Sequence, residues 1–166
     1  NINYFDKRIK KKLPKITKLE SVNWSEINVL FTCLPAGESQ VIIKSLIKHR
    51  NLKIIDLSAD FRLNKEFSYK KHYGFKHKAK HLLKFSIYSL TEFVKKEIKK
   101  YKIIACPGCY PTSIQLPLIP LLKMNLIKKK NIIIDSKSGY SGAGKNLKEK
   151  FTHKNLYSSI HTYGIH

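Results

Sequence analysis

The sequence predicts an α/β fold with a parallel sheet. Apolar segments of strand length alternate with segments whose apolar residues follow helical spacing, and this alternation is typical of βαβ units. The clearest unit is a strand, a helix and a second strand between Ile27 and Leu57. Because two strands joined through a helix need a crossover, we expect them to run in parallel.

The further elements follow from the local sequence. Pro35-Ala36-Gly37 closes the first strand, and residues 61–89 are basic and aromatic without a clear period, so we expect a long irregular excursion with one short helix there. Pro117 and Pro120 interrupt the last helical segment and predict a kink or a restart. The expected strands are residues 27–34, 52–57, 102–105 and 131–135, and the expected helices are residues 41–47, 91–100 and 112–125.

The chain is strongly basic. Its 166 residues suit one domain or incomplete pieces of two, and Lys+Arg 33 against Asp+Glu 11 give a formal net charge of +22. Such a charge is expected of a nucleic-acid binder or of an enzyme with polyanionic ligands. The lysines are spread over every segment, however, and lack the interleaved aromatic residues of a base-stacking surface. We therefore favour compositional drift and expect no specific nucleic-acid partner.

The cysteine content and the hydropathy bear on the compartment. Three cysteines are too few for a disulfide framework, so we expect a reducing, cytoplasmic location. No apolar run approaches the length of a membrane span, about 20 residues, so no membrane partner is expected. Asn1 opens no charged-then-apolar leader and lies in mid-pattern, which is expected of a fragment.

Cys109 is the residue from which a function can be argued. It lies between the apolar segment 103–105 and a helical segment, and Pro107-Gly108 predicts a tight turn directly before it. Thr112 or Ser113 is expected to cap the helix, whose unpaired amides and positive end would stabilise a thiolate.

Cys106 and Cys109 also form a C-x-x-C pair, which leaves alternatives open. This spacing serves zinc half-sites and disulfide exchange, and a structural cysteine is a third alternative. A zinc site needs a second pair of ligands, whereas Cys33 stands alone, so we expect no metal.

A second group of interest is the glycine-rich run from Asp135 to Lys145. Gly139, four intervening residues and Gly144-Lys145 come close to a phosphate-binding P-loop, but Asn146 stands where a Ser or Thr should hold magnesium. This departure argues against a nucleoside triphosphatase. The small residues still allow backbone amides to approach an anionic ligand, with a plain surface turn as the alternative.

Histidine is the natural partner of a catalytic thiol, because imidazole exchanges protons near neutral pH. Most of the seven histidines lie in basic stretches and are expected to be solvated. His161 and His166 follow the glycine-rich run and are the candidates that could fold back toward Cys109.

Four stretches together resemble the N-acetyl-gamma-glutamyl-phosphate reductase family, whose members are NADPH-dependent enzymes of arginine biosynthesis. They occur in the order of that family and spread over most of the chain from Val29 onward. They are Leu34-Pro35-Ala36-Gly37-Glu38-Ser39, Asp56-Leu57-Ser58-Ala59-Asp60-Phe61-Arg62-Leu63, Pro107-Gly108-Cys109-Tyr110-Pro111-Thr112, and Asp135-Ser136-Lys137-Ser138-Gly139 with Ser141-Gly142-Ala143-Gly144.

The resemblance implies two domains. Residues 1–106 would be the remainder of an NADP-binding domain with a Rossmann-like sheet, and residues 107–166 the start of an α/β catalytic and oligomerisation domain. The first βα unit of the family, which carries its glycine-rich dinucleotide fingerprint, is not found in this sequence. We therefore expect an internal fragment that is inactive alone and belongs to a homo-oligomer when full length.

The resemblance also implies roles for single residues. Cys109 would be the nucleophile, and His166 either the base or its neighbour. The residues implied in cofactor binding are Pro35 and Gly37, along the cleft at the carboxyl end of their strand, and Ser141 and Gly142, beside the nicotinamide. Departures from the family pattern are Cys106 in place of the usual Asn, Ala36 in place of a frequent His, and Lys145 in place of a frequent Arg.

The implied reaction is the reduction of N-acetyl-glutamyl phosphate, a small acyl phosphate, to the semialdehyde. Phosphate would leave as a thioester forms on the cysteine, and NADPH would deliver the hydride. The nearest alternative is the same reaction on a carrier-bound aminoadipyl phosphate of lysine biosynthesis, which the motifs do not separate. A basic nucleic-acid-binding fragment is the alternative from another class.

Overall fold

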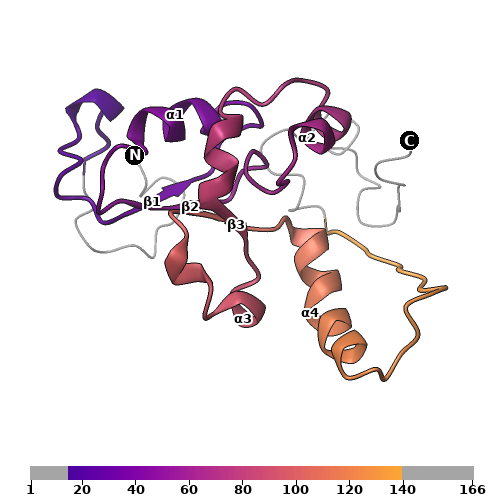
Figure 1. The fold of residues 1–166 in the computed structure, drawn as a ribbon. Helices are drawn as coiled ribbons and strands as arrows, with labels where there is room; N and C mark the ends of the chain where they lie inside the picture. The colour runs from indigo at the N-terminus through magenta and orange to yellow at the C-terminus, as the bar shows by residue number, and fades with distance from the viewer. Residues whose placement is uncertain (1–14, 140–166) are drawn as a thin grey trace. The chain divides into compact units, whose positions relative to one another are not determined.

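The computed structural model describes residues 15–139. The chain divides into two compact units, the first ending at Thr112 and the second beginning at Ser113. The first unit contains a four-stranded sheet with the strand order β1-β2-β4-β3, in which every neighbouring pair is parallel. Figure 1 labels β1, β2 and β3 of this sheet. The predicted α/β fold with a parallel sheet is therefore confirmed.

The strands are short and the helices lie between them in the chain. The strands are β1 (Val29–Thr32), β2 (Lys53–Asp56), β3 (Ser86–Tyr88) and β4 (Ile103–Ala105). The helices are α1 (Ser39–Leu46), α2 (Glu66–Tyr73), α3 (Thr91–Val94) and α4 (Cys109–Lys123), with the 3-10 helices η2 (Leu19–Ser21), η3 (Lys80–Phe85) and η4 (Ile98–Lys100).

The register of the sheet brings three strand ends together at one edge. Thr32 of β1 is paired with Asp56 of β2, and Asp56 is paired with Ala105 of β4. The ladder continues for one more residue, because the backbone N–H of Cys106 donates to the carbonyl oxygen of Asp56 at 2.8 Å. The segments that follow β1, β2 and β4 therefore leave the sheet at its carboxyl edge, where α/β proteins bind ligands.

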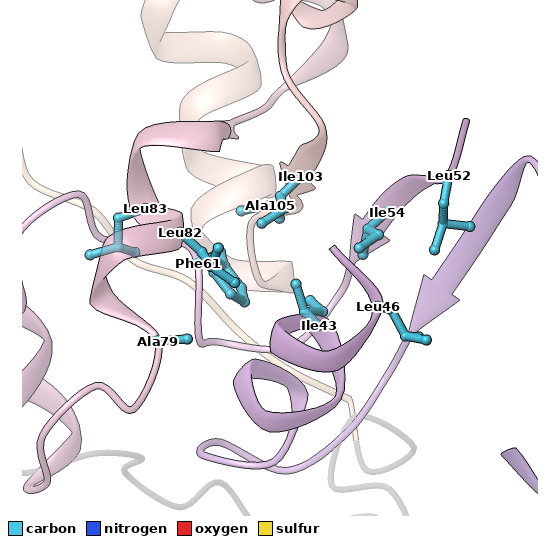
Figure 2. Packing of buried hydrophobic residues seen from close by; sticks show 10 residues of the cluster. All are labelled: Ile43, Leu46, Leu52, Ile54, Phe61, Ala79, Leu82, Leu83, Ile103 and Ala105. Carbon is cyan, nitrogen blue, oxygen red and sulfur yellow. The ribbon is translucent and has the colours of Figure 1, made fainter. Parts of the chain in front are cut away.

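The core of the first unit lies between the sheet and the segments that cover it. Ile43 and Leu46 of α1 lie close to Leu52 and Ile54, and all four are almost fully buried (Figure 2). The other core residues shown there are Phe61, Ala79, Leu82, Leu83, Ile103 and Ala105. α1 therefore places Ile43 and Leu46 in the core, whereas Val41, which also belongs to its predicted helical spacing, is 49% exposed.

The excursion over residues 61–89 is more regular than predicted. The expected short helix is α2, but the same stretch also contains η3 and the edge strand β3. β3 has only three residues, all half-buried, and is held by its backbone bonds to β4. A strand this short gives no alternating pattern in the sequence, which is why it was not predicted.

One prediction for the second unit is wrong, and of the predicted kink or restart at the two prolines only the restart is excluded. Residues 131–135 form no strand, and Ile133 is 95% exposed, because no partner strand is present for them among residues 113–139. The helix containing Pro117 and Pro120 continues without a restart from Cys109 to Lys123. None of the helices between residues 15 and 139 has the length and apolar character that crossing a membrane requires.

Candidate active site at the carboxyl edge of the sheet

Cys109 is the first residue of α4 and is exposed. β4 leads to it through Cys106, Pro107 and Gly108, which form neither helix, strand nor turn. The predicted tight turn is therefore wrong. A turn would bond the Cys106 carbonyl oxygen to the amide of Cys109, whereas this oxygen accepts a hydrogen bond from Nε of Arg62 at 2.7 Å.

The predicted capping of the helix is also wrong, because α4 begins three residues earlier than expected. Thr112 lies in its first turn, and both its backbone N–H and its hydroxyl donate to the carbonyl oxygen of Gly108, at 3.0 and 2.8 Å. A hydroxyl that donates to a carbonyl leaves the first amides of the helix without a side-chain cap from this residue. The exposed thiol of Cys109 is thus placed at the amino-terminal end of a helix of 15 residues.

Cys106 differs from Cys109 in its surroundings. Its side chain is partly buried at the end of β4. Burial raises the pKa of the Cys106 thiol, the Asp56 carboxylate raises it further, and the Arg62 guanidinium opposes both effects. A raised pKa lowers the thiolate fraction at neutral pH, so Cys106 is the poorer nucleophile of the pair.

Asp56 connects the ends of neighbouring strands next to residues 106–108, the link between β4 and Cys109. Its Oδ1 accepts hydrogen bonds from the Thr32 hydroxyl at 2.7 Å, from the Ser39 hydroxyl at 2.8 Å and from the Ser58 amide at 3.1 Å. The side chain is fully buried, and its Oδ2 has no hydrogen-bond partner in the described part of the chain. Asp56 therefore ties β1, the start of α1 and the segment after β2 to one another.

Asp60 fixes the loop that follows β1. Its carboxylate accepts hydrogen bonds from the Gly37 amide at 2.8 Å, the Gln40 amide at 3.0 Å and the Tyr69 hydroxyl at 2.6 Å. Burial and the neighbouring Asp60 both raise the pKa of Tyr69, so its phenol stays protonated and donates. Gly37 has φ +94, and a Cβ placed on it would lie 3.1 Å from the Phe75 ring.

The two predicted cofactor residues of this loop have different environments. Pro35 is exposed, whereas Gly37 is buried with its amide bonded to Asp60. Exposed Pro35 and Ala36 fit a cofactor that lies along the carboxyl edge of the sheet, and Gly37 is suited to support the loop from behind. Their part in cofactor binding stays a prediction.

The histidines are only partly as expected. His77 is buried rather than solvated, because Phe61 and Tyr69 pack edge-on against its ring. Its Nδ1 accepts the amide proton of Ala79 at 3.0 Å, so Nε2 carries the proton and donates to the Asp60 carbonyl oxygen at 2.9 Å. Burial lowers the pKa of His77 and keeps it neutral.

Three predicted site residues, Ser141, Gly142 and His166, lie outside the described residues. Within residues 15–139 the side chains of His, Cys, Asp and Glu form no group that could hold a metal ion. Sequence reasoning assigned no role to Arg62, Asp56 or Asp60, although all three lie in the stretch that carried part of the resemblance.

Comparison with known proteins agrees with this architecture. Residues 4–104 match the semialdehyde dehydrogenase NAD binding domain, and residues 109–166 match the semialdehyde dehydrogenase dimerisation domain. The chain belongs to the semialdehyde dehydrogenase family. The four-stranded parallel sheet is thus part of a Rossmann-like domain, and its family match indicates a nicotinamide cofactor.

Similar proteins within the family carry one name. The chain is 50% identical to a probable N-acetyl-gamma-glutamyl-phosphate reductase, chloroplastic, of Arabidopsis thaliana, over 93% of the chain and 38% of that protein. It is 47% identical to the protein of the same name from Oryza sativa, over 97% of the chain and 38% of that protein. It is also 47% identical to N-acetyl-gamma-glutamyl-phosphate reductase of Rhodospirillum rubrum, over 92% of the chain and 44% of that protein.

Proposed function

We propose that the protein containing this chain is an N-acetyl-gamma-glutamyl-phosphate reductase that uses NADP and acts in arginine biosynthesis. Over the aligned segments, the relatives with this name are 41% to 50% identical to the chain. The observation that carries the proposal is the placement of an exposed cysteine, Cys109, at the start of α4 and the carboxyl edge of the sheet. The chain spans 38% to 44% of the length of the three relatives named above, so the reaction is proposed for the whole protein.

Cys109 has the surroundings that a nucleophile needs. Its thiol is exposed and lies at the amino-terminal, positive end of α4. As thiolate, Cys109 attacks the acyl carbon of the acyl phosphate. The carbon–oxygen bond to phosphate breaks, phosphate leaves with the electron pair, and a thioester forms on the sulfur. The positive, amino-terminal end of α4 stabilises the negative charge that builds on the acyl oxygen during the attack.

The cofactor supplies one part of the reaction when it is bound, namely the hydride that reduces the thioester carbon. Pro35 and Ala36, exposed after β1, are the described residues suited to line its cleft, together with Ser141 and Gly142. The resulting thiohemiacetal then collapses, which releases the semialdehyde and restores the thiolate of Cys109.

A histidine provides acid and base catalysis in this proposal. His77 is unsuited to that role, because it is buried and both of its ring nitrogens are occupied by backbone groups. His166 or a neighbouring histidine is therefore the proposed base. We also propose that the whole protein is a cytoplasmic homo-oligomer, consistent with the match of residues 109–166 to a dimerisation domain.

The test compares Cys109→Ser with Cys106→Ser in the full-length protein. NADPH oxidation with the acyl phosphate should fall at least ~10³-fold for Cys109→Ser, because a serine hydroxyl ionises far less readily than a thiol and is a much poorer nucleophile at neutral pH. Cys106→Ser should lose far less. Equal losses for the two variants would indicate a dithiol and contradict the assignment of Cys109 as nucleophile. If the wild-type protein turned over a carrier-bound aminoadipyl phosphate and not N-acetyl-glutamyl phosphate, the enzyme would belong to lysine biosynthesis.

A further inference from the structure

Arg62 holds the first residue of the link 106–108, which joins β4 to Cys109. Its Nε donates to the Cys106 carbonyl oxygen at 2.7 Å, and its Nη2 donates to the Leu57 carbonyl oxygen at 2.8 Å. Its Nη1 lies 3.4 Å from the position that a Cβ on Gly108 would occupy. The guanidinium fork therefore joins the carbonyl oxygens that follow two different strands.

The two carbonyls that Arg62 joins belong to neighbouring strands. Leu57 follows β2 and Cys106 follows β4, one residue beyond the last paired row of Asp56 and Ala105. The N–H of Cys106 is bonded to the Asp56 carbonyl oxygen. The backbone of Cys106 is thus fixed on both sides, by the sheet through its N–H and by Arg62 through its C=O.

Without Arg62 the link has little of its own to hold it. Residues 106–108 form no turn, so no backbone bond within the link fixes its path. Beyond Cys109 the backbone is fixed again, because Thr112 donates twice to the Gly108 carbonyl oxygen. Arg62 therefore fixes the backbone path of residues 106–108 between the end of β4 and the start of α4.

We propose that Arg62 is a positioning residue for Cys109, acting through its two carbonyl contacts and the link 106–108. The inference rests on the proposed function of Cys109 as nucleophile. A catalytic group displaced by about 1 Å can lose about 10²-fold in rate. A lysine at position 62 would keep the positive charge but present a single ammonium, which cannot reproduce the fork between two carbonyls.

The experiment measures Arg62→Lys in the full-length protein by amide hydrogen exchange and by steady-state kinetics. Amides of residues 106–112 should exchange about tenfold faster, while β1 and β2 keep their protection. The turnover number kcat should fall about 10-fold to 100-fold with KM for the acyl phosphate within about threefold of the wild type. Ethylguanidinium added to Arg62→Ala should restore kcat, whereas ethylammonium should not.

Lys53→Gln is the matched control. Lys53 also donates to two backbone carbonyls, those of Lys99 and Tyr101, but at the start of β2, the opposite edge of the sheet. Its loss should leave kcat and the exchange of residues 106–112 unchanged.

Three results would overturn the proposal. A rise in KM at constant kcat would make Arg62 a substrate contact, and unchanged exchange at residues 106–112 would show that the link does not depend on it. Loss of protection in β1 and β2 together with the link would make Arg62 a general structural residue. Full activity of Cys109→Ser would instead refute the proposed function, with hydrogen exchange still deciding whether Arg62 fixes the link.

Discussion

Replacement of Asp60 by alanine should destabilise the first unit severely, because three buried donors lose their common acceptor. These donors are the amides of Gly37 and Gln40 and the hydroxyl of Tyr69. A buried donor left unsatisfied costs about 1–3 kcal/mol, so for three donors the free energy of unfolding should fall by roughly 3–9 kcal/mol. A loss of this size approaches the whole stability of a typical domain, about 5–15 kcal/mol.

Asp60→Asn gives a graded version of the same change. The amide oxygen can still accept at the position of Oδ1, but its NH₂ group would oppose the N–H of Gln40, which now donates to Oδ2. One lost acceptor predicts a decrease of about 1–3 kcal/mol. Asp135→Asn is the control, since Asp135 is exposed and, among the described residues, pairs with Lys137 in a surface ion pair. It should change the stability by less than about 0.5 kcal/mol.

Urea unfolding followed by tryptophan fluorescence measures these differences. Trp24 is the single tryptophan and packs against the core, so its emission reports on the first unit. If Asp60→Ala lies within about 1 kcal/mol of the wild type, the three hydrogen bonds do not carry the stability assigned to them and the reasoning is refuted.

Three other outcomes are expected. Gly37→Ala should destabilise by about 1–3 kcal/mol, because it forces a side chain into a positive φ and against Phe75; an unchanged urea midpoint would contradict this. Stability should fall as the pH drops below 6.5, since burial lowers the pKa of His77 and the unfolded chain binds the proton first. His77→Gln, which does not titrate, should show a smaller pH-dependent decrease in the urea midpoint than the wild type. DNA binding should be non-specific and should weaken steeply with salt, and selective binding at physiological salt in a gel assay would favour the nucleic-acid alternative.

The sequence predicted the elements whose signal is local. β1, α1, β2 and β4 were all expected within a few residues, because each has an apolar run or a helical period of its own. The strand expected at residues 131–135 failed for the opposite reason. Three isoleucines favour extended backbone, but a strand also needs a partner, which local sequence cannot supply.

Only the part of the candidate site that has a local sequence signal was predicted. Cys109 could be selected because the strand before it and the helix after it are both visible in the sequence. The contact between Arg62 and Cys106 joins residues 44 positions apart and is made to a backbone carbonyl oxygen. No sequence motif around Cys106 or Cys109 could therefore have predicted it. The expectation that most histidines are solvated rested on their basic neighbours and does not hold for His77, because Phe61 and Tyr69 pack against its ring.

The strand order has a consequence for how this protein is made on the ribosome. β4 is the last strand of the sheet to be synthesised, yet it occupies an inner position between β2 and β3. Until residue 105 has emerged, β2 and β3 each present an unpaired edge to other nascent chains. The sheet is therefore completed only when β4, the strand that leads to Cys109, is inserted between β2 and β3. Slow codons just after this point would lengthen the time for correct insertion, whereas a pause before β4 would prolong the exposure of both edges.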